Sequence, residues 1–357
     1  MRARRTSCRT VRISASCRNN SGTPRFPPRR STRTSASRSC ARCIASRTRG
    51  PEPLIRLASA DGPEHLRPVL VSAAQAKLNL SLAITGRRED GFHELVSLVA
   101  PLALADTLTL EPGRPLGLSC DDASLPVDGA NLVLKAAAAY LKRRPSAIVG
   151  HFHLIKKVPH GAGLGGGSSD AAAALRLLDE ASGAPLGAEV LEGIAAEVGS
   201  DCAFFVRGQA AVMRGRGERL EILPATARAA LVGRKVVLVK PPFGVPTPEA
   251  YGLLAMAGNY RPAAQAEAEL AAWVAQPASD PSVLGNDLAA PVFAKYLALP
   301  VGLASFRPST GANWQMTGSG SACFSFVSDG FDHARLREEV RQAWGPGAWV
   351  QETVISG

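Results

Sequence analysis

Acidic residues and lysine are missing from the first fifty residues of this 357-residue chain. That stretch contains 14 Arg and 15 Ser or Thr, so it carries a charge of +14 by itself. The other residues contain 27 Lys or Arg against 30 Asp or Glu, although the whole chain has a formal charge of +11. The basic character therefore belongs to a tail, and it does not mark the body as a binder of nucleic acid or membrane surfaces.

Large apolar side chains are also scarce in the tail, so we expect residues 1–68 to be disordered. An Arg- and Ser-rich segment without acids is typical of a transit peptide or of a nucleic-acid-binding arm. A third interpretation, which we favour, is a misassigned start, because the apolar pattern begins abruptly at Val69 after a Pro-rich stretch. Aromatic residues are not interleaved with the arginines, so we expect no nucleic-acid partner. The expected location is cytoplasmic, or a plastid if the tail is a transit peptide.

The chain has no run of 18 apolar residues, which argues against a membrane-spanning helix and a membrane partner. The body has three widely spaced cysteines, Cys120, Cys202 and Cys323, and no CxxC pair. This pattern disfavours a disulfide framework and a structural zinc site. Cys40 and Cys43 do have CxxC spacing, but no second pair or histidine lies nearby, so we attribute that spacing to chance.

The body has a mixed pattern of strands and helices. About 290 residues are more than one core usually serves, so we expect two lobes, at residues 69–230 and 231–357. β-branched and apolar residues predict strands at 69–84, ending at a Thr85-Gly86 turn, at 94–110 and at 151–158. An Ala-rich helix is predicted at 131–143, ending before Pro145.

A glycine-rich segment follows the strand predicted at 151–158. Five glycines occur in the seven residues 161–167, followed by Ser-Ser-Asp, which we expect to cap a helix, and then by an Ala-rich stretch. Glycine permits positive φ and close approach of a ligand, and the free amides of a first helical turn attract an anion. A hinge is the alternative, but a hinge does not need a capped helix directly after it. The segment therefore predicts a phosphate site.

Common phosphate motifs do not explain this segment. Gly161, Gly163 and Gly166 satisfy GxGxxG, but the acidic residue that a dinucleotide site needs about 20 residues later is missing. No Lys-Ser or Lys-Thr pair closes the loop, which excludes a Walker A site. The HRD and DFG elements of protein kinases are absent as well.

Residues 159–172 instead resemble the GHMP kinases, whose motif is Pro-x-x-x-Gly-Leu-Gly-Ser/Gly-Ser-Ser-Ala/Asp. Within that superfamily the body resembles the 4-diphosphocytidyl-2-C-methyl-D-erythritol kinases. The segments that carry this second resemblance are 76–80, 84–94, 131–132, 199–201, 246–248, 286–288 and 316–322. An ordered set of this kind is a far more specific signal than the glycine segment alone.

The resemblance implies a fold and a reaction. The implied fold is α+β and two-lobed, with an S5-like N-terminal lobe and a ferredoxin-like C-terminal lobe. The implied reaction uses ATP and Mg²⁺ to phosphorylate the 2-hydroxyl of 4-diphosphocytidyl-2-C-methyl-D-erythritol, giving the 2-phosphate and ADP in non-mevalonate isoprenoid biosynthesis. Alternatives are another GHMP kinase acting on mevalonate or homoserine, and a nucleic-acid-binding protein that uses the tail and an S5-like lobe. The oligomeric state is left open.

Two residues are expected to carry the chemistry. Asp201 follows a predicted helix at 187–198, where it either caps the next segment or receives the proton of the attacking hydroxyl. Lys77 lies in an apolar strand, so it either pairs with an anion or faces solvent at an edge. The resemblance favours catalysis, because it implies that Asp201 and Lys77 form a pair.

The implied ATP site covers the whole glycine-rich segment. Its residues are Pro159, His160, Gly161, Ala162, Gly163, Leu164, Gly165, Gly166, Gly167, Ser168 and Ser169. Either serine could contact a phosphate or Mg²⁺, but helix capping explains both without a ligand. The sequence assigns no acidic Mg²⁺ ligand.

The implied substrate site is built from polar, aromatic and glycine residues. Its members are Asn79, Phe92, His93, Thr247, Tyr251, Gly318, Ser319 and Gly320. In the resembling family an aromatic ring on each side and a histidine hold the cytosine; here Phe92 replaces the usual tyrosine, which keeps the ring and loses a hydroxyl. Hydrophobic packing is the alternative for either ring, and a hairpin turn is the alternative for the glycines at 318–320.

Overall fold

The first sheet is organised around one long strand, β3 (His93–Pro112). The computed structural model describes residues 68–357 except 278, so the predictions made for the tail lie outside the described residues. On one side of β3, the strands β1 (Leu70–Asn79) and β2 (Ala83–Arg87) pair with it antiparallel. On its other side lie β5 (Gly150–Ile155) and β6 (Ala211–Gly215). The outer strands are β4 (Gly117–Cys120), parallel to β5, and β7 (Arg219–Ile222), next to β6.

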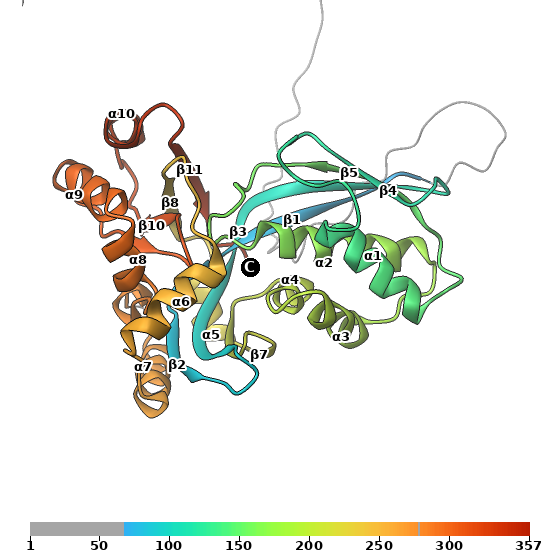
Figure 1. The fold of residues 1–357 in the computed structure, drawn as a ribbon, viewed down its shortest axis with the longest axis horizontal. Coiled ribbons are helices and arrows are strands. Elements are labelled where there is room, and N and C mark those ends of the chain that lie inside the picture. Colours follow the sequence, from blue (N-terminus) through green and yellow to red (C-terminus); the bar gives the residue numbers. More distant parts are fainter. Residues whose placement is uncertain (1–67, 278) are drawn as a thin grey trace, which may run out of the picture. The chain divides into compact units, whose positions relative to one another are not determined.

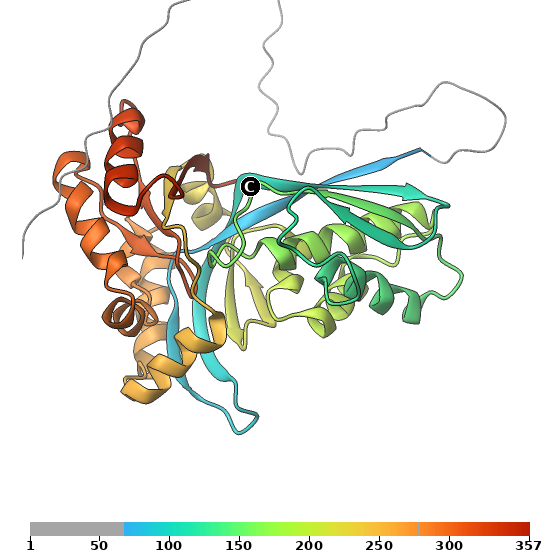
Figure 2. The same cartoon turned by 45° about the horizontal axis from the view of Figure 1, so that its top comes forward.

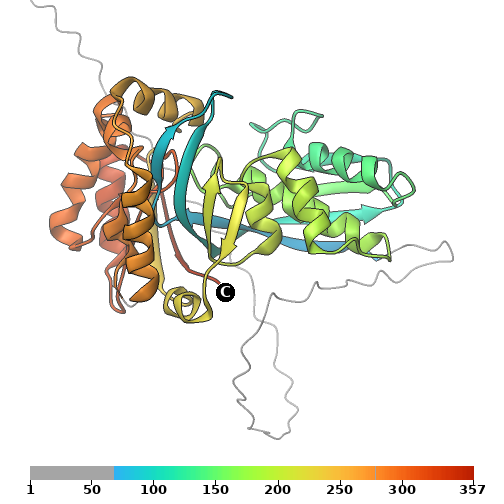
Figure 3. The same cartoon turned by 90° about the horizontal axis from the view of Figure 1, so that it is seen from below.

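Helices cover one face of this sheet, as Figures 1 and 3 show. They are α1 (Leu132–Arg143), α2 (Gly166–Ala181), α3 (Ala188–Val198) and α4 (Cys202–Arg207). The buried face of α2 is rich in alanine and leucine and packs on β1 and β3. Because alanine lets a helix approach closely, the N-terminus of α2 is brought to the strand that carries Lys77.

A second sheet of four antiparallel strands has the order β11-β8-β10-β9. Figure 2 shows the helices of the C-terminal part of the chain, in orange and red, beside it. Its strands are β8 (Lys235–Lys240), β9 (Gln315–Met316), β10 (Cys323–Phe326) and β11 (Trp349–Val354). The accompanying helices are α5 (Ala225–Leu231), α6 (Thr247–Ala257), α7 (Ala263–Ala275), the 3₁₀ helix η1 (Pro281–Leu284), α8 (Ala289–Lys295), α9 (Ala298–Thr310) and α10 (His333–Trp344). The predicted α+β class is confirmed.

The two sheets share buried apolar residues. Leu78 and Leu98 from the first sheet belong to the same buried cluster as Leu238 and Phe324 from the second. A continuous apolar junction of this kind holds the elements on its two sides in a fixed relation. The boundary predicted near residue 230 stays a prediction.

Several predicted elements are confirmed, and two boundaries are wrong. The strand predicted at 151–158 is β5, which ends at Ile155. The helix predicted at 131–143 is α1, and Asn131 caps it by accepting a bond from Val133 N at 2.9 Å. The strand ending predicted at Thr85-Gly86 is wrong, because the chain leaves β1 after Asn79 and β2 runs through Gly86. Gly86 follows an irregularity in the pairing with β3, which a turn-forming residue tolerates inside a strand.

Among the described residues, no single helix is long and apolar enough to cross a membrane. The helices α8 and α9 pass that test only as a pair, which is bent by 103° at the break between them.

Candidate active site

One cavity of about 1280 Å³ brings together nearly all the residues predicted for the site. The predicted residues that line it are Lys77, Asn79, Phe92, His93, residues 159–168, Asp201, Thr247, Tyr251, Gly318 and Ser319. Ser169 and Gly320 are not among its lining residues. Both sheets contribute, since Lys77 belongs to β1, and Gly318 and Ser319 lie between β9 and β10.

The glycine loop, residues 161–167, is held through its carbonyl groups. Leu164 O accepts a hydrogen bond from Lys77 N at 3.0 Å, and Ala162 O accepts one from Ala322 N at 3.2 Å. Among the described residues, no hydrogen bond is made by the backbone amides of residues 163–168, and all six residues line the cavity. Unpaired amides at the start of a helix form an anion site.

The predicted serine cap of the next helix is wrong. The helix α2 begins at Gly166, preceded by Gly165, and no side chain caps it. Gly165 has φ +72°, and a Cβ at this position would lie 2.6 Å from Phe205 Cζ, so only glycine fits. Ser168 and Ser169 therefore lie within the first helical turn, and the amides that a cap would have used remain free.

A buried charge cluster that the sequence did not reveal supports the start of α2. Lys156 Nζ lies 2.5 Å from Asp106 Oδ2 and 2.8 Å from Asp170 Oδ2. Asp106 also accepts bonds from the amides of Lys157 and Val158, at 2.5 and 2.8 Å. Burial raises the pKa of Asp170 to about 7, although the nearby Lys156 ammonium opposes this shift. Burial alone would lower the pKa of Lys156, but its two carboxylate partners raise it.

The predicted pairing of Lys77 with Asp201 is present. Lys77 Nζ lies 3.8 Å from Asp201 Oδ2, and the lysine side chain is 6% exposed against 38% for the aspartate. Burial lowers the pKa of Lys77, and the Asp201 carboxylate opposes that shift. Asp201 directly precedes α4 but makes no capping bond to it. Its carboxylate is therefore not engaged in capping and faces the cavity beside a buried ammonium.

Asn79 links the first strand to the other wall of the cavity. Its side-chain oxygen accepts a bond from Lys77 Nζ, and its Nδ2 donates to Ser97 Oγ at 2.8 Å. Its backbone amide donates to Thr317 Oγ1 at 2.9 Å. Lys77 and Asn79 thus point to the same face of β1, as a two-residue spacing in a strand requires.

The aromatic residues gather around His93. Its ring centroid lies 5.1 Å from that of Tyr251 and 5.9 Å from that of Tyr260. Burial lowers the pKa of His93, and the charge of Arg87 adds to this effect. Phe92 is half exposed, with the Arg216 guanidinium 4.7 Å from its ring centroid. Sequence reasoning missed Tyr260, because it lies on a connection between α6 and α7 with no motif around it.

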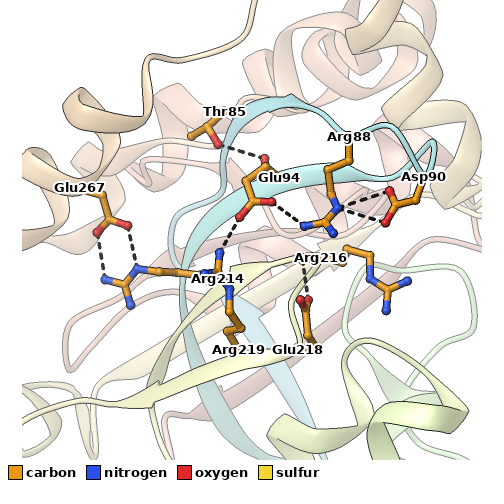
Figure 4. Close-up of polar contacts among 9 residues, drawn as sticks. All are labelled: Thr85, Arg88, Asp90, Glu94, Arg214, Arg216, Glu218, Arg219 and Glu267. Atoms are coloured by element: carbon orange, nitrogen blue, oxygen red, sulfur yellow. Dashed lines mark hydrogen bonds and ion pairs between the residues drawn. The ribbon is translucent and has the colours of Figure 1, made fainter.

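An ion-pair network holds the hairpin that carries Phe92 and His93 (Figure 4). The Glu94 carboxylate lies between Arg88 at 2.8 Å and Arg219 at 2.6 Å. Arg88 also bonds Asp90, whose Oδ1 accepts from the amide of Phe92 at 3.1 Å. The turn between β2 and β3 is therefore tied to the strand β7 by side chains on its rim.

The second glycine turn, residues 317–321, connects β9 to β10, so the hairpin interpretation is correct for its backbone. It also lines the cavity through Gly318 and Ser319. Ser319 Oγ lies 3.0 Å from Thr247 Oγ1. A Cβ at Gly318 would lie 2.9 Å from Gly163 O, so the two glycine segments are in direct contact. Gly320 packs instead on Met316, where a Cβ would lie 2.7 Å from the sulfur.

Comparison with known proteins identifies the family. A model of the GHMP kinases N terminal domain matches residues 131–209. A protein of Methylobacterium radiotolerans named 4-diphosphocytidyl-2-C-methyl-D-erythritol kinase is 37% identical over 300 residues, covering 80% of this chain and 99% of the relative. One of the same name from Synechococcus is 41% identical over 281 residues, covering 73% and 88%. This chain belongs to the 4-diphosphocytidyl-2-C-methyl-D-erythritol kinase family.

Solved structures agree with this family. A crystal structure of 4-(cytidine 5'-diphospho)-2C-methyl-D-erythritol kinase has a TM-score of 0.63 and 36% identity, covering 80% of this chain and all of that one. A homoserine kinase from Cytophaga hutchinsonii has a TM-score of 0.55 at 16% identity, covering 84% and 98%, which shows a shared fold alone. The two-lobed GHMP kinase fold implied by the sequence is confirmed for this member of the 4-diphosphocytidyl-2-C-methyl-D-erythritol kinase family.

Proposed function

We propose that the chain transfers the γ-phosphoryl group of ATP to the 2-hydroxyl of 4-diphosphocytidyl-2-C-methyl-D-erythritol, giving the 2-phosphate and ADP. The observation that carries this proposal is the Lys77–Asp201 pair, which lies in the same cavity as a glycine loop with unpaired amides. Phosphoryl transfer needs positioning and charge stabilisation more than covalent chemistry, and these elements supply both.

The glycine loop is the proposed site for the ATP phosphates. The backbone amides of residues 163–168 would donate to phosphate oxygens, and the positive end of the α2 dipole adds to this attraction. Bonds to Lys77 N and Ala322 N hold the loop carbonyls, so the amides are positioned before ATP binds. The loop therefore contributes fixed donors where negative charge spreads in the transition state.

Asp201 is the proposed acceptor for the hydroxyl proton. In a loose transition state the attacking oxygen forms little bond to phosphorus until late, so its proton becomes acidic only then, and a carboxylate can orient the hydroxyl first and accept the proton afterwards. Lys77 balances the charge of Asp201. It donates to the side chain of Asn79, whose backbone amide donates to Thr317 of the second glycine turn. Neither residue needs to form a covalent intermediate.

Recognition of the cytidine base is assigned to the aromatic cluster. Phe92 and Tyr251 would flank the base, and His93 between them would hydrogen-bond to its edge. The lowered pKa of His93 favours the neutral ring, which carries both a donor and an acceptor nitrogen. Gly318, Ser319 and Thr247 would contact the rest of the substrate.

Magnesium is proposed to enter with ATP. Among the described residues, no group of three or more His, Cys, Asp or Glu could hold a metal ion. Mg²⁺ in such sites is usually coordinated by water and phosphate oxygens and by only one or two protein carboxylates, so no larger cluster is required. Asp170 lines the cavity, and its Oδ1 is buried without a hydrogen-bond partner among the described residues. It is one carboxylate of the cavity that fits this role, and Asp201 is another.

The proposed function is tested by ADP release from the full chain with Mg-ATP and a panel of alcohols. The panel contains the cytidyl substrate, mevalonate and homoserine. We expect turnover of the cytidyl substrate alone, because the other two alcohols have no base to fill the aromatic cluster. Turnover of mevalonate or homoserine without the cytidyl substrate would contradict the proposal. The bacterial relatives support a cytoplasmic location as part of the same proposal.

A further inference from the structure

Asn286 holds the second glycine turn from outside the cavity. It lies between η1 and α8, and its side-chain amide donates hydrogen bonds of 2.8 Å to the carbonyl oxygens of both Met316 and Gly318. The described residues that line the cavity include Gly318 and Ser319 but not Asn286. Asn286 therefore contacts the backbone of a binding element without facing the substrate.

The backbone beside Asn286 is fixed to the first sheet. Leu82, between β1 and β2, donates its amide to Gly285 O at 2.9 Å and accepts a bond from Asp287 N at 2.9 Å. Asp287 Oδ2 in turn accepts from Ile84 N at 2.9 Å. Residues 285–287 are thus hydrogen-bonded to the first sheet, while Asn286 in their middle binds the second glycine turn, which belongs to the second sheet.

The orientation of the Asn286 amide is determined by its partners. Its Oδ1 accepts from Leu288 N at 3.0 Å, and its nitrogen meets two carbonyl oxygens. The flipped amide would place its oxygen against both carbonyls and its nitrogen against an N–H donor. Only an amide side chain of this length satisfies all three groups, so an isosteric carboxylate cannot replace it.

The second glycine turn contacts both the glycine loop and the strand that carries Lys77 and Asn79. Gly318 abuts Gly163 of the glycine loop, and Thr317 Oγ1 accepts from Asn79 N at 2.9 Å. Gly318 has φ +55°, which glycine adopts without strain but which does not by itself fix the backbone, so the position of the turn depends on its hydrogen-bond partners. A small shift of Gly318 would therefore move Ser319 relative to Asp201.

We propose that Asn286 is a positioning residue. It fixes the backbone of Gly318, and with it Ser319, at the position relative to Asp201 that binding of the alcohol substrate requires. It acts through the turn and does not touch the substrate. The inference rests on the proposed function only for the choice of alcohol in the assay, because the position of the turn can be measured without turnover.

The test is Asn286→Asp in the full chain, which keeps the shape and replaces two donors by acceptors facing carbonyl oxygens. We expect kcat/KM for the cytidyl substrate to fall at least about tenfold. The Kd of ATP should change less than kcat/KM does, because Lys77 N of the first sheet holds Leu164 O of the glycine loop independently of the turn. Amide hydrogen exchange in residues 317–321 should become faster. Asn313→Asp, an exposed position shortly before β9, is the matched control and should leave all three quantities unchanged.

Other outcomes decide against the inference. Unchanged kinetics and exchange in a folded Asn286→Asp protein would overturn it, and so would an equal loss of ATP affinity, which would show general support of the junction between the sheets. If circular dichroism shows that Asn286→Asp does not fold, Asn286→Ala is judged by the same measurements. Absence of turnover by the wild type would contradict the proposed function, and exchange in residues 317–321 would then decide the role of Asn286.

Discussion

The two glycine segments that meet in the cavity are held in different ways. The glycine loop is held by its carbonyl oxygens, which accept bonds from Lys77 N and Ala322 N, while the amides of residues 163–168 remain unpaired among the described residues. The second glycine turn is held by side chains, since Asn286 binds the carbonyl oxygens of Gly318 and of the preceding Met316, and Ser319 meets Thr247. Within the described part of the chain, both segments have unpaired backbone amides that line the cavity, but only the glycine loop has them at the start of a helix, and only the second turn adds a side-chain hydroxyl, that of Ser319.

This difference separates two kinds of recognition. A loop whose amides stay free suits an anion that every ATP molecule presents in the same form. A turn set by side chains from distant segments suits a substrate whose shape must be distinguished from others. Substitutions should therefore affect ATP binding through the first segment and alcohol selection through the second.

The largest expected effect comes from Asp201, which belongs to neither segment. Asp201→Asn should lower kcat by at least about 10²-fold, because the amide cannot accept the hydroxyl proton. Both glycine segments stay intact, so the Kd of ATP should be nearly unchanged in a titration. A loss of ATP affinity with kcat preserved would contradict the catalytic role and would leave Asp201 a structural residue.

The contact between the two segments is broken by Gly163→Ala. Gly163 has φ +75°, and its Cβ would lie 2.2 Å from Thr317 O, so the segments must move apart. We expect a loss of about 3 kcal/mol in the free energy of unfolding, together with weaker binding of both substrates. Denaturant unfolding and titrations measure these changes.

Gly183→Ala is the matched control for Gly163→Ala. Gly183 has a similar φ of +69°, but a Cβ there would meet nothing within 4 Å. It should cost about 1 kcal/mol and leave substrate binding intact. Equal losses at the two positions would show that backbone strain, and not the contact between the segments, decides the outcome.

A pH-dependent effect is expected at the helix that follows the glycine loop. Burial raises the pKa of Asp170 to about 7, whereas the unfolded carboxyl ionises near its ordinary value. The folded protein therefore binds the Asp170 proton more tightly than the unfolded chain does. This contributes to the free energy of unfolding at low pH, and the contribution is lost as the pH rises toward 7. Between pH 4 and pH 8 the unfolding free energy of Asp170→Asn should thus rise by about 4 kcal/mol relative to that of the wild type.

The control for Asp170 is Asp329→Asn. The exposed Asp329 has its pKa lowered by its bond to Lys235, so the sign of its pH dependence is reversed. Thermal melts of the three proteins at several pH values measure both trends. An unfolding free energy of Asp170→Asn that stays constant or falls relative to that of the wild type as the pH rises would refute the raised pKa.

The smallest effect is expected in the second glycine turn. Ser319→Ala removes one hydrogen bond to Thr247, so KM for the alcohol should rise roughly two- to tenfold while KM for ATP stays unchanged. A double-mutant cycle with Thr247→Val measures the coupling. Strictly additive effects would show that the two hydroxyls act separately.

The predictions that were confirmed rest on local patterns. The helix at 131–143 follows from its alanine content, and the strand–loop–helix unit follows from a glycine cluster between two periodic segments. The serine cap of α2 was wrong because Gly165, with its positive φ, starts the helix instead. A local pattern could not reveal this, since the reason is the close approach of Phe205.

The amino-acid sequence alone determined the strand–loop–helix unit and the family, and it predicted the phosphate site, because glycine spacing and ordered motifs are local properties. Only the tertiary structure decided which charges and rings meet: Lys156 with Asp106 and Asp170, Tyr260 with His93, and Asn286 with the second glycine turn. These partners lie far apart along the chain, and hydrogen bonds and ion pairs act only over a few ångströms. Their meeting therefore depends on how the two sheets pack, which no local pattern encodes.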